Sequence, residues 1–192
     1  DGDVAIFSLE MSKESLVNRR LSAEANVDNY TIRRASFSIP EWEAITMACS
    51  TLSNTRIYID DTPSTTTTDM KAKLRRLDNP KIVIIDYLQL IECDKYSDNK
   101  VLQVAEITRS LKLIAKEMKI PIILCSQLSR PNKNVKEKRP MLSDLRDSGA
   151  IEQDADIVML LYRDDYYDNS GNADQDPTKQ QEIECIIGKN RH

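Results

Sequence analysis

The sequence contains very little histidine, and its cysteines are not grouped. The only histidine is His192, so we expect neither histidine-based catalysis nor a histidine-rich metal site. The four cysteines are scattered and form no CxxC pair. This pattern is typical of reduced cytosolic thiols, and it predicts a cytoplasmic protein.

Long apolar runs and a signal peptide are also missing. No apolar stretch is long enough to span a membrane, and the first residues, Asp1-Gly2-Asp3, do not resemble a signal peptide. With 192 residues, 40% hydrophobic and 30% charged, the composition is ordinary for a soluble chain that buries a real core. We therefore predict a single domain over residues 1–192.

The charge balance does not favour a typical nucleic-acid binder. The formal net charge is −4, whereas nucleic-acid binders are more often basic. Basic residues gather between Arg130 and Arg139, and acidic residues between Asp164 and Asp176. We interpret both runs as solvated loops, although the basic one could contact DNA. Any contact with nucleic acid must then come from a few well-aimed groups.

The stretch from Lys81 to Ile91, KIVIIDYLQLI, organises the rest of the prediction. Its β-branched run, Ile82 to Ile85, fits a strand that is buried on both faces of a parallel sheet. Asp86 ends the run, and in open α/β sheets the working site lies beyond the carboxyl ends of the strands. Two interpretations are open for Asp86: an acidic cap at a turn, or the carboxylate that holds Mg²⁺ in a nucleotide hydrolase.

Apolar strands alternate with amphipathic helices along the chain, which predicts βαβ units and a mainly parallel sheet. The last two strands are joined by a polar loop, so we expect them to be antiparallel. Trp42, on a helix opened by a capping box at Ser38 and Glu41, is expected to anchor the core. The predicted strands are Val4–Ser8, Arg56–Asp60, the strand ending at Asp86, Pro121–Ser126, Ile157–Leu161 and Ile183–Ile187.

Polar side chains follow three of these strands: Glu10, Asp86 and the pair Ser126-Gln127. Parallel strands place their carboxyl ends at one edge of a sheet. Such a set suits nucleotide hydrolysis, in which one carboxylate orients Mg²⁺, another polarises the attacking water and an amide senses the γ-phosphate.

Four segments resemble the bacterial replicative DNA helicases of the DnaB type, and more closely their RecA-like motor domain. They are FSLEM (Phe7 to Met11), IIDYLQLI (Ile84 to Ile91), CSQLSR (Cys125 to Arg130) and the long block from Lys138 to Tyr167. The resemblance implies a RecA-like P-loop NTPase fold of class α/β, with a twisted sheet flanked by helices and a C-terminal antiparallel strand pair. It also implies a hexameric, ATP-dependent helicase that moves on single-stranded DNA and unwinds duplex at the replication fork.

The resemblance also implies roles for single residues at the nucleotide site. Glu10 matches the catalytic glutamate, Asp86 the Mg²⁺-coordinating aspartate, and Gln127 the glutamine that couples the γ-phosphate to the DNA-binding loops. Lys189 and Arg191 match the pair that reaches into the ATP site of the neighbouring subunit, where the arginine acts on the transition-state charge.

Arg146, Asp147 and Gly149 match the loop that holds the phosphates of single-stranded DNA. The family commonly has Glu where this chain has Asp147, so we expect this acidic residue to orient Arg146 or to meet a neighbouring subunit. Gly149 fits a loop in which the backbone must approach a phosphate closely.

The sequence departs from the family in one large respect. The phosphate-binding loop G-x-x-x-x-G-K-[ST] is absent, because none of the four glycines precedes Lys-Ser or Lys-Thr. We therefore expect an incomplete motor domain without its first strand, inactive by itself, whose primase and helicase loader bind through regions absent from this chain. Two other hypotheses are a RecA-like ATPase with another role, and a non-catalytic assembly module that has lost its phosphate loop.

Overall fold

The computed structural model describes residues 2–93, 95–96, 99–129, 139–145, 149–163 and 182–191. The chain forms two compact units. Unit 1 comprises Asp1–Asp94 and Leu113–Ser126, and unit 2 comprises Lys95–Lys112 and Gln127–His192. In the described ranges, no helix has the length and apolar character needed to cross a membrane.

Unit 1 is built on a four-stranded sheet in the order β2-β1-β3-β4, and all three of its strand pairs are parallel, as predicted. The central position of β1 and β3 follows from their apolar, β-branched sequences, which fit a strand with neighbours on both sides. The strands are β1 (Asp3–Ser8), β2 (Ile57–Asp60), β3 (Pro80–Asp86) and β4 (Ile122–Leu124).

A buried carboxylate fixes the amino end of this sheet. Asp3, which is fully buried, lies 2.6 Å from the Nε atom of Arg56. The backbone N–H of Asn79 donates a hydrogen bond of 3.0 Å to the other carboxylate oxygen. Arg56 directly precedes β2 and Asn79 directly precedes β3. One side chain therefore aligns the starts of three neighbouring strands.

The helices of unit 1 begin where the sequence places capping residues. The hydroxyl of Ser12 accepts a hydrogen bond from the backbone N–H of Ser15, and the Glu41 carboxylate accepts one of 2.7 Å from the backbone N–H of Ser38. Thr66 forms a capping box with Asp69. The helices are α1 (Lys13–Ala25), α2 (Asn29–Arg34), α3 (Ile39–Ser53) and α4 (Thr67–Leu74), followed by the 3₁₀ turn η1 (Leu88–Leu90).

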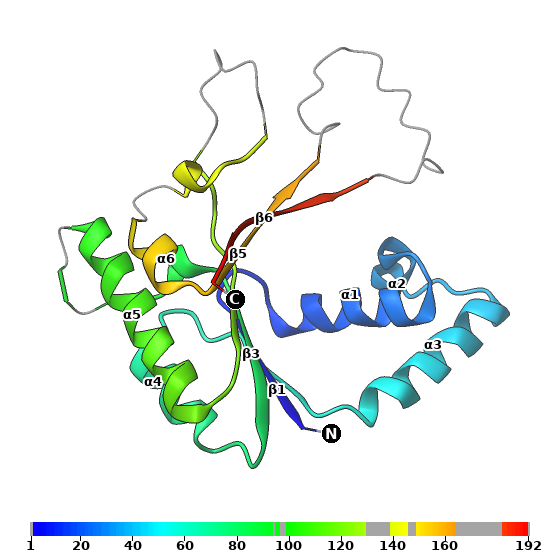
Figure 1. Ribbon diagram of the computed structural model, residues 1–192. Helices are drawn as coiled ribbons and strands as arrows, with labels where there is room; N and C mark the ends of the chain where they lie inside the picture. Colours follow the sequence, from blue (N-terminus) through cyan, green and yellow to red (C-terminus); the bar gives the residue numbers. More distant parts are fainter. Residues whose placement is uncertain are drawn as a thin grey trace. The chain divides into compact units, whose positions relative to one another are not determined.

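One face of the sheet carries the core of unit 1. Figure 1 shows α4 on one side of β1 and β3, with α1 and α3 on the other. Lys71 and Arg75 of the α4 segment both pair with Glu117, in the last part of α5 (Lys100–Met118), at 2.6 and 2.7 Å. Among the most deeply buried residues of α4, β1 and β3 are Phe7, Met70, Leu74, Val83 and Ile85.

Two expectations about burial were wrong. Val83 and Ile85 of β3 are fully buried, but Ile82 and Ile84, which alternate with them along the strand, are only partly buried, so the two faces of the strand are not covered equally. Trp42 is not a core anchor, since 59% of its surface is exposed. It packs on Phe37 instead, with ring centroids 5.7 Å apart, while α3 turns Ile45 and Ala48 inward.

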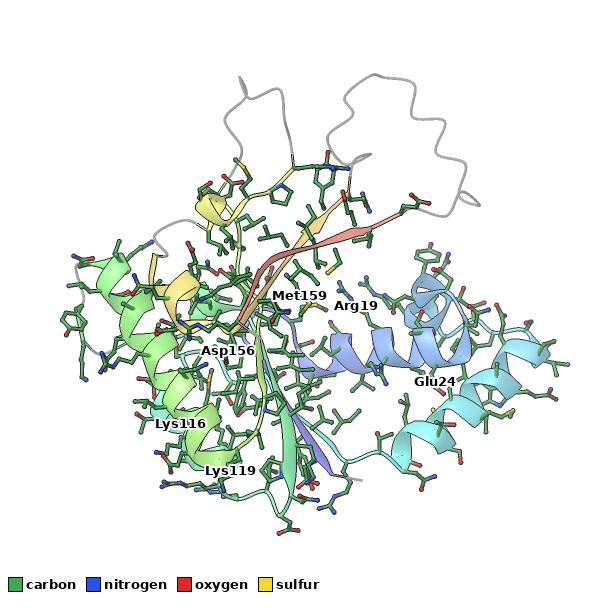
Figure 2. All side chains as sticks on the ribbon, viewed as in Figure 1. Arg19, Glu24, Lys116, Lys119, Asp156 and Met159 are labelled. Atoms are coloured by element: carbon green, nitrogen blue, oxygen red, sulfur yellow. The ribbon has the colours of Figure 1, made fainter. Side chains whose placement is uncertain are left out.

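Unit 2 contains the antiparallel strand pair that the sequence predicted, β5 (Ile157–Tyr162) with β6 (Glu184–Asn190). It also holds the first part of α5, the 3₁₀ turn η2 (Leu142–Asp144) and α6 (Gly149–Asp154). Side chains alternate along β5, so Leu160 is buried while Met159, labelled in Figure 2, is 58% exposed. The buried apolar residues of unit 2 are Ile107, Leu111, Leu145, Ile151, Val158, Leu160 and Tyr162.

A β-bulge at Gly188 interrupts the pairing of β6 with β5. Met159 pairs with Ile187 and Val158 pairs with Lys189, which leaves Gly188 as the extra residue. A Cβ atom on Gly188 would lie 3.0 Å from the Cδ2 atom of Leu142. The missing side chain therefore lets η2 approach β6 closely.

We predict that Gly188→Ala lowers the free energy of unfolding by about 1 kcal/mol, because Leu142 must move to admit the methyl group. The matched control is Gly149→Ala, since a Cβ atom at Gly149 would meet nothing within 4 Å among the described residues. Thermal unfolding of both variants checks this. Equal midpoints for the two variants would contradict it.

Candidate functional site

The carboxyl edge of the unit 1 sheet brings two of the predicted site residues to neighbouring strands. Ser8 at the end of β1 is in register with Asp86 at the end of β3, and the backbone N–H of Leu9 donates a hydrogen bond of 2.8 Å to the Asp86 carbonyl. The buried Ser8 hydroxyl donates to the Met11 carbonyl at 2.7 Å. This bond closes a turn around Glu10, whose side chain is exposed.

The β4 side of this edge lies close to Asp86 as well. The backbone N–H of Cys125 donates to the Ile85 carbonyl, and the N–H of Leu88 donates to the Cys125 carbonyl, both at 2.9 Å. The side-chain amide of Gln89 donates a hydrogen bond of 3.0 Å to the Ser126 hydroxyl. Sequence reasoning missed Gln89, because no spacing pattern links it to a residue on another strand.

Four further predicted residues belong to unit 2, and the structure describes two of them. Gln127 is the first residue of that unit after Ser126, and its side chain is exposed. Gly149 is the exposed first residue of α6. Arg146 and Asp147 lie outside the described residues.

Lys189 and Arg191 both reach the carboxyl end of α6. The Lys189 ammonium donates to the carbonyl of Glu152, and the Arg191 guanidinium donates to the carbonyl of Gln153 at 2.6 Å. Both side chains therefore lie on the same side of the strand end, as expected for residues two apart along a strand. Sequence reasoning gave no sign of these partners within the same chain.

The charge of Asp86 acts on a neighbouring thiol. Partial burial, and in second place the negative charge of Asp86, raise the pKa of the Cys125 thiol. Both causes oppose the thiolate, so we expect Cys125 to stay protonated and poorly nucleophilic at neutral pH. This shift links Cys125 electrostatically to the same sheet edge.

The oxygen donors at this edge suit a magnesium ion more than a transition metal. Within the described ranges, no three His, Cys, Asp or Glu side chains gather as a metal-binding group. Mg²⁺ keeps several waters and needs only one or two protein carboxylates when phosphates supply the other ligands. Asp86, partly buried at the end of β3, fits that requirement.

The structure has a parallel sheet with polar groups beyond its carboxyl edge and an antiparallel strand pair, an architecture that RecA-like domains share. The solved structure of the RadB recombinase matches 99% of the chain with a TM-score of 0.53 at 13% sequence identity. At that identity the match supports the fold alone.

The family follows from the sequence itself. The model of the DnaB-like helicase C terminal domain matches residues 1–192, and the chain belongs to this family of helicase ATPase domains.

The relatives include the replicative DNA helicase DnaB of Geobacillus stearothermophilus, 48% identical over 99% of this chain and 41% of its own length. The replicative DNA helicase DnaC of Bacillus subtilis is 47% identical over 100% of this chain and 42% of its own length. The chain therefore spans well under half of these relatives.

Two solved structures share the fold closely, each with a TM-score of 0.87 and 38% identity over 100% of this chain. One is the ATPase domain of G40P, of which the match covers 68%. The other is a DnaB-like replicative helicase, solved to describe its interactions with primase, of which the match covers 46%.

We predict that Asp86→Asn speeds the alkylation of Cys125, because loss of the negative charge lowers the pKa of the thiol and raises its thiolate fraction. Alkylation by iodoacetamide near pH 8, resolved by mass spectrometry of peptides, measures the rate at each cysteine. The exposed Cys49 on α3 is the internal control, and its rate should stay the same. An unchanged rate at Cys125 would show that the Asp86 charge does not reach it.

Proposed function

We propose that this chain is part of the motor of a hexameric replicative DNA helicase, which hydrolyses ATP with Mg²⁺, translocates on single-stranded DNA and unwinds duplex at the replication fork. The observation that carries the proposal is the register of Ser8 with Asp86, which brings the turn of Glu10 and the end of β3 to one edge. Membership in the family supports the same function.

Each carboxylate at the edge has one task in this proposal. Asp86 would hold Mg²⁺, which would supply positive charge to offset the charge of the phosphates. Glu10 accepts a hydrogen bond from a water molecule and orients it for attack on the γ-phosphate. An exposed side chain suits this second task, because Glu10 must meet a water and a nucleotide that come from outside the sheet.

Three further residues, Gln127, Lys189 and Arg191, are assigned to the nucleotide in this proposal. Gln127 lies three residues after the end of β4 (Ile122–Leu124), and its role in this proposal is to relay the state of the γ-phosphate towards the DNA-binding loop. Lys189 and Arg191 act in the ATP site of the adjacent subunit, where Arg191 stabilises charge in the transition state. Assembly as a hexamer is then a requirement of catalysis, because each site takes its arginine from a neighbour.

Contact with DNA is assigned to Arg146, Asp147 and Gly149. Arg146 binds a backbone phosphate, and Asp147 orients it. Apart from its chain neighbours and its own helix backbone, no described atom lies within 4 Å of a Cβ placed on Gly149, so packing among the described residues does not require glycine there. Close approach to a phosphate gives a reason for the residue. Phosphate contacts carry no base information, so binding should not depend on DNA sequence.

The partners follow from the replicative role. A DnaB-like relative has been solved to describe its interactions with primase, and we assign primase and a helicase loader to regions of the full-length protein other than this chain. A role at the replication fork of a bacterial cell also implies a cytoplasmic location.

We predict that Glu10→Gln, in a full-length helicase that carries this chain, lowers DNA-stimulated ATP hydrolysis by about 100-fold or more, because the amide cannot polarise water as the carboxylate does. Binding of a fluorescent ATP analogue should remain nearly unchanged, since the side chains are similar in size. Steady-state hydrolysis and equilibrium binding are the measurements.

The matched control is Glu14→Gln, which removes an exposed carboxylate from the first turn of α1 and should keep normal hydrolysis. Retention of most of the turnover by Glu10→Gln would remove Glu10 from the catalytic role.

A further inference from the structure

The carboxyl end of α6 receives two cations from the end of β6. Lys189 donates to the carbonyl of Glu152, and Arg191 donates to the carbonyl of Gln153 at 2.6 Å. The last carbonyl groups of a helix have no partner within the helix and carry its partial negative charge. We call the carbonyl groups of Glu152 and Gln153 the seat of Arg191, and the second of them orients the Arg191 side chain.

Asp156 makes two further contacts with Arg191 and so forms part of this seat. Its carbonyl accepts a hydrogen bond of 3.0 Å from the backbone N–H of Arg191, and its carboxylate lies 3.7 Å from a guanidinium nitrogen. Figure 2 labels Asp156 at the turn between α6 and β5. About half of the Arg191 side chain, 49%, stays exposed, so the seat leaves a face of the guanidinium open to an incoming group.

Two residues of helix α5 contact the acidic side chains at and just after the end of α6. The buried Thr108 hydroxyl donates a hydrogen bond of 2.7 Å to the Asp154 carboxylate, and Lys112, one helical turn further along, pairs with the Asp156 carboxylate. The two acidic residues at the end of α6 are thus each tied to α5. The Lys112–Asp156 pair is partly exposed, at 37% and 49%, so it contributes little to the orientation of Asp156 compared with the contacts at the end of α6.

We infer that Asp156 is a positioning residue for Arg191, which presents the guanidinium to the nucleotide site of the adjacent subunit. This inference rests on the proposed function, because Arg191 must act in trans for its orientation to matter. At 3.7 Å the ion pair is longer than a hydrogen bond. Asp156 can therefore orient the guanidinium without a hydrogen bond, and the N–H groups that do not donate to the Gln153 carbonyl remain for a phosphate, which binds an arginine fork in two-pronged geometry.

A purely structural role is the competing explanation. In that case Asp156 only ties α6 to α5 through Lys112, and Arg191 is a bystander. The two explanations differ in what Lys112 contributes. If Asp156 only ties α6 to α5, loss of Lys112 should lower DNA-stimulated ATP hydrolysis as much as loss of Asp156 does. If Asp156 orients Arg191, loss of Lys112 should lower hydrolysis far less.

The test uses full-length helicase carrying Asp156→Asn, Asp156→Glu, Lys112→Met or Arg191→Ala, with ring formation confirmed for each variant. Asp156→Asn should lower kcat for DNA-stimulated ATP hydrolysis by about 10- to 100-fold, the scale expected for a misplaced catalytic group, with little change in KM. Asp156→Glu, which keeps the charge, should lose much less, and Lys112→Met should stay within about threefold of the wild type.

Two further readouts separate orientation of Arg191 from general damage. In an Arg191→Ala background, Asp156→Asn should cause no additional loss, because residues that act as a unit are not additive. In mixed rings, Asp156→Asn subunits should regain activity with Glu10→Gln subunits but not with Arg191→Ala subunits. The fault would then lie on the side of the interface that donates the arginine.

The test distinguishes failure of the proposed function from failure of the role assigned to Asp156. If Arg191→Ala keeps normal hydrolysis, the action of Arg191 in trans is wrong, and the inference fails with it. If Arg191→Ala is inactive but Asp156→Asn is active, only the inference fails. Equal losses in Asp156→Asn and Lys112→Met, or additive losses in the double variant, would assign Asp156 to a structural tie. If Asp156→Asn forms no rings, Asp156→Glu decides, because a charged variant that forms rings without activity also contradicts the inference.

Discussion

The parallel register of β1 with β3 is the constraint on which the rest of the site depends. At the amino end, the buried Asp3 carboxylate joins the segments that precede β2 and β3. At the carboxyl end, Leu9 donates to the Asp86 carbonyl. These contacts fix the register of the strands at both ends. Because side chains alternate along a strand, a slip by one residue would turn every side chain to the opposite face. The same slip would move Glu10 along the edge relative to Asp86.

The elements of the fold could be predicted because their signals are local. The β-branched run before Asp86 and the capping residues Ser12 and Ser38 mark strand and helix limits that the structure has. The degree of burial was harder to predict, because it depends on which layer covers a face. The apolar pattern around Trp42 is consistent with a core position, but α3 turns Ile45 and Ala48 inward and leaves the indole exposed.

The arrangement of the candidate site was predictable only at the strand ends. Glu10 and Asp86 follow apolar strands, and parallel pairing brings those ends together. The contacts of Lys189 and Arg191 could not be predicted, because their partners are backbone carbonyls 37 and 38 residues away. A carbonyl group is present at every residue and leaves no mark in the sequence. The geometry of α6 alone decides which carbonyls face β6.

The central claim is that one ATP site takes Glu10 from one subunit and Arg191 from its neighbour. The most direct measurement is ATP hydrolysis by rings mixed from Arg191→Ala and Glu10→Gln subunits over a range of ratios. Some interfaces in such rings carry an intact Glu10 facing an intact Arg191, so activity should rise above that of either variant alone. If mixed rings form and stay inactive at every ratio, while each variant mixed with wild type remains active, the claim is contradicted.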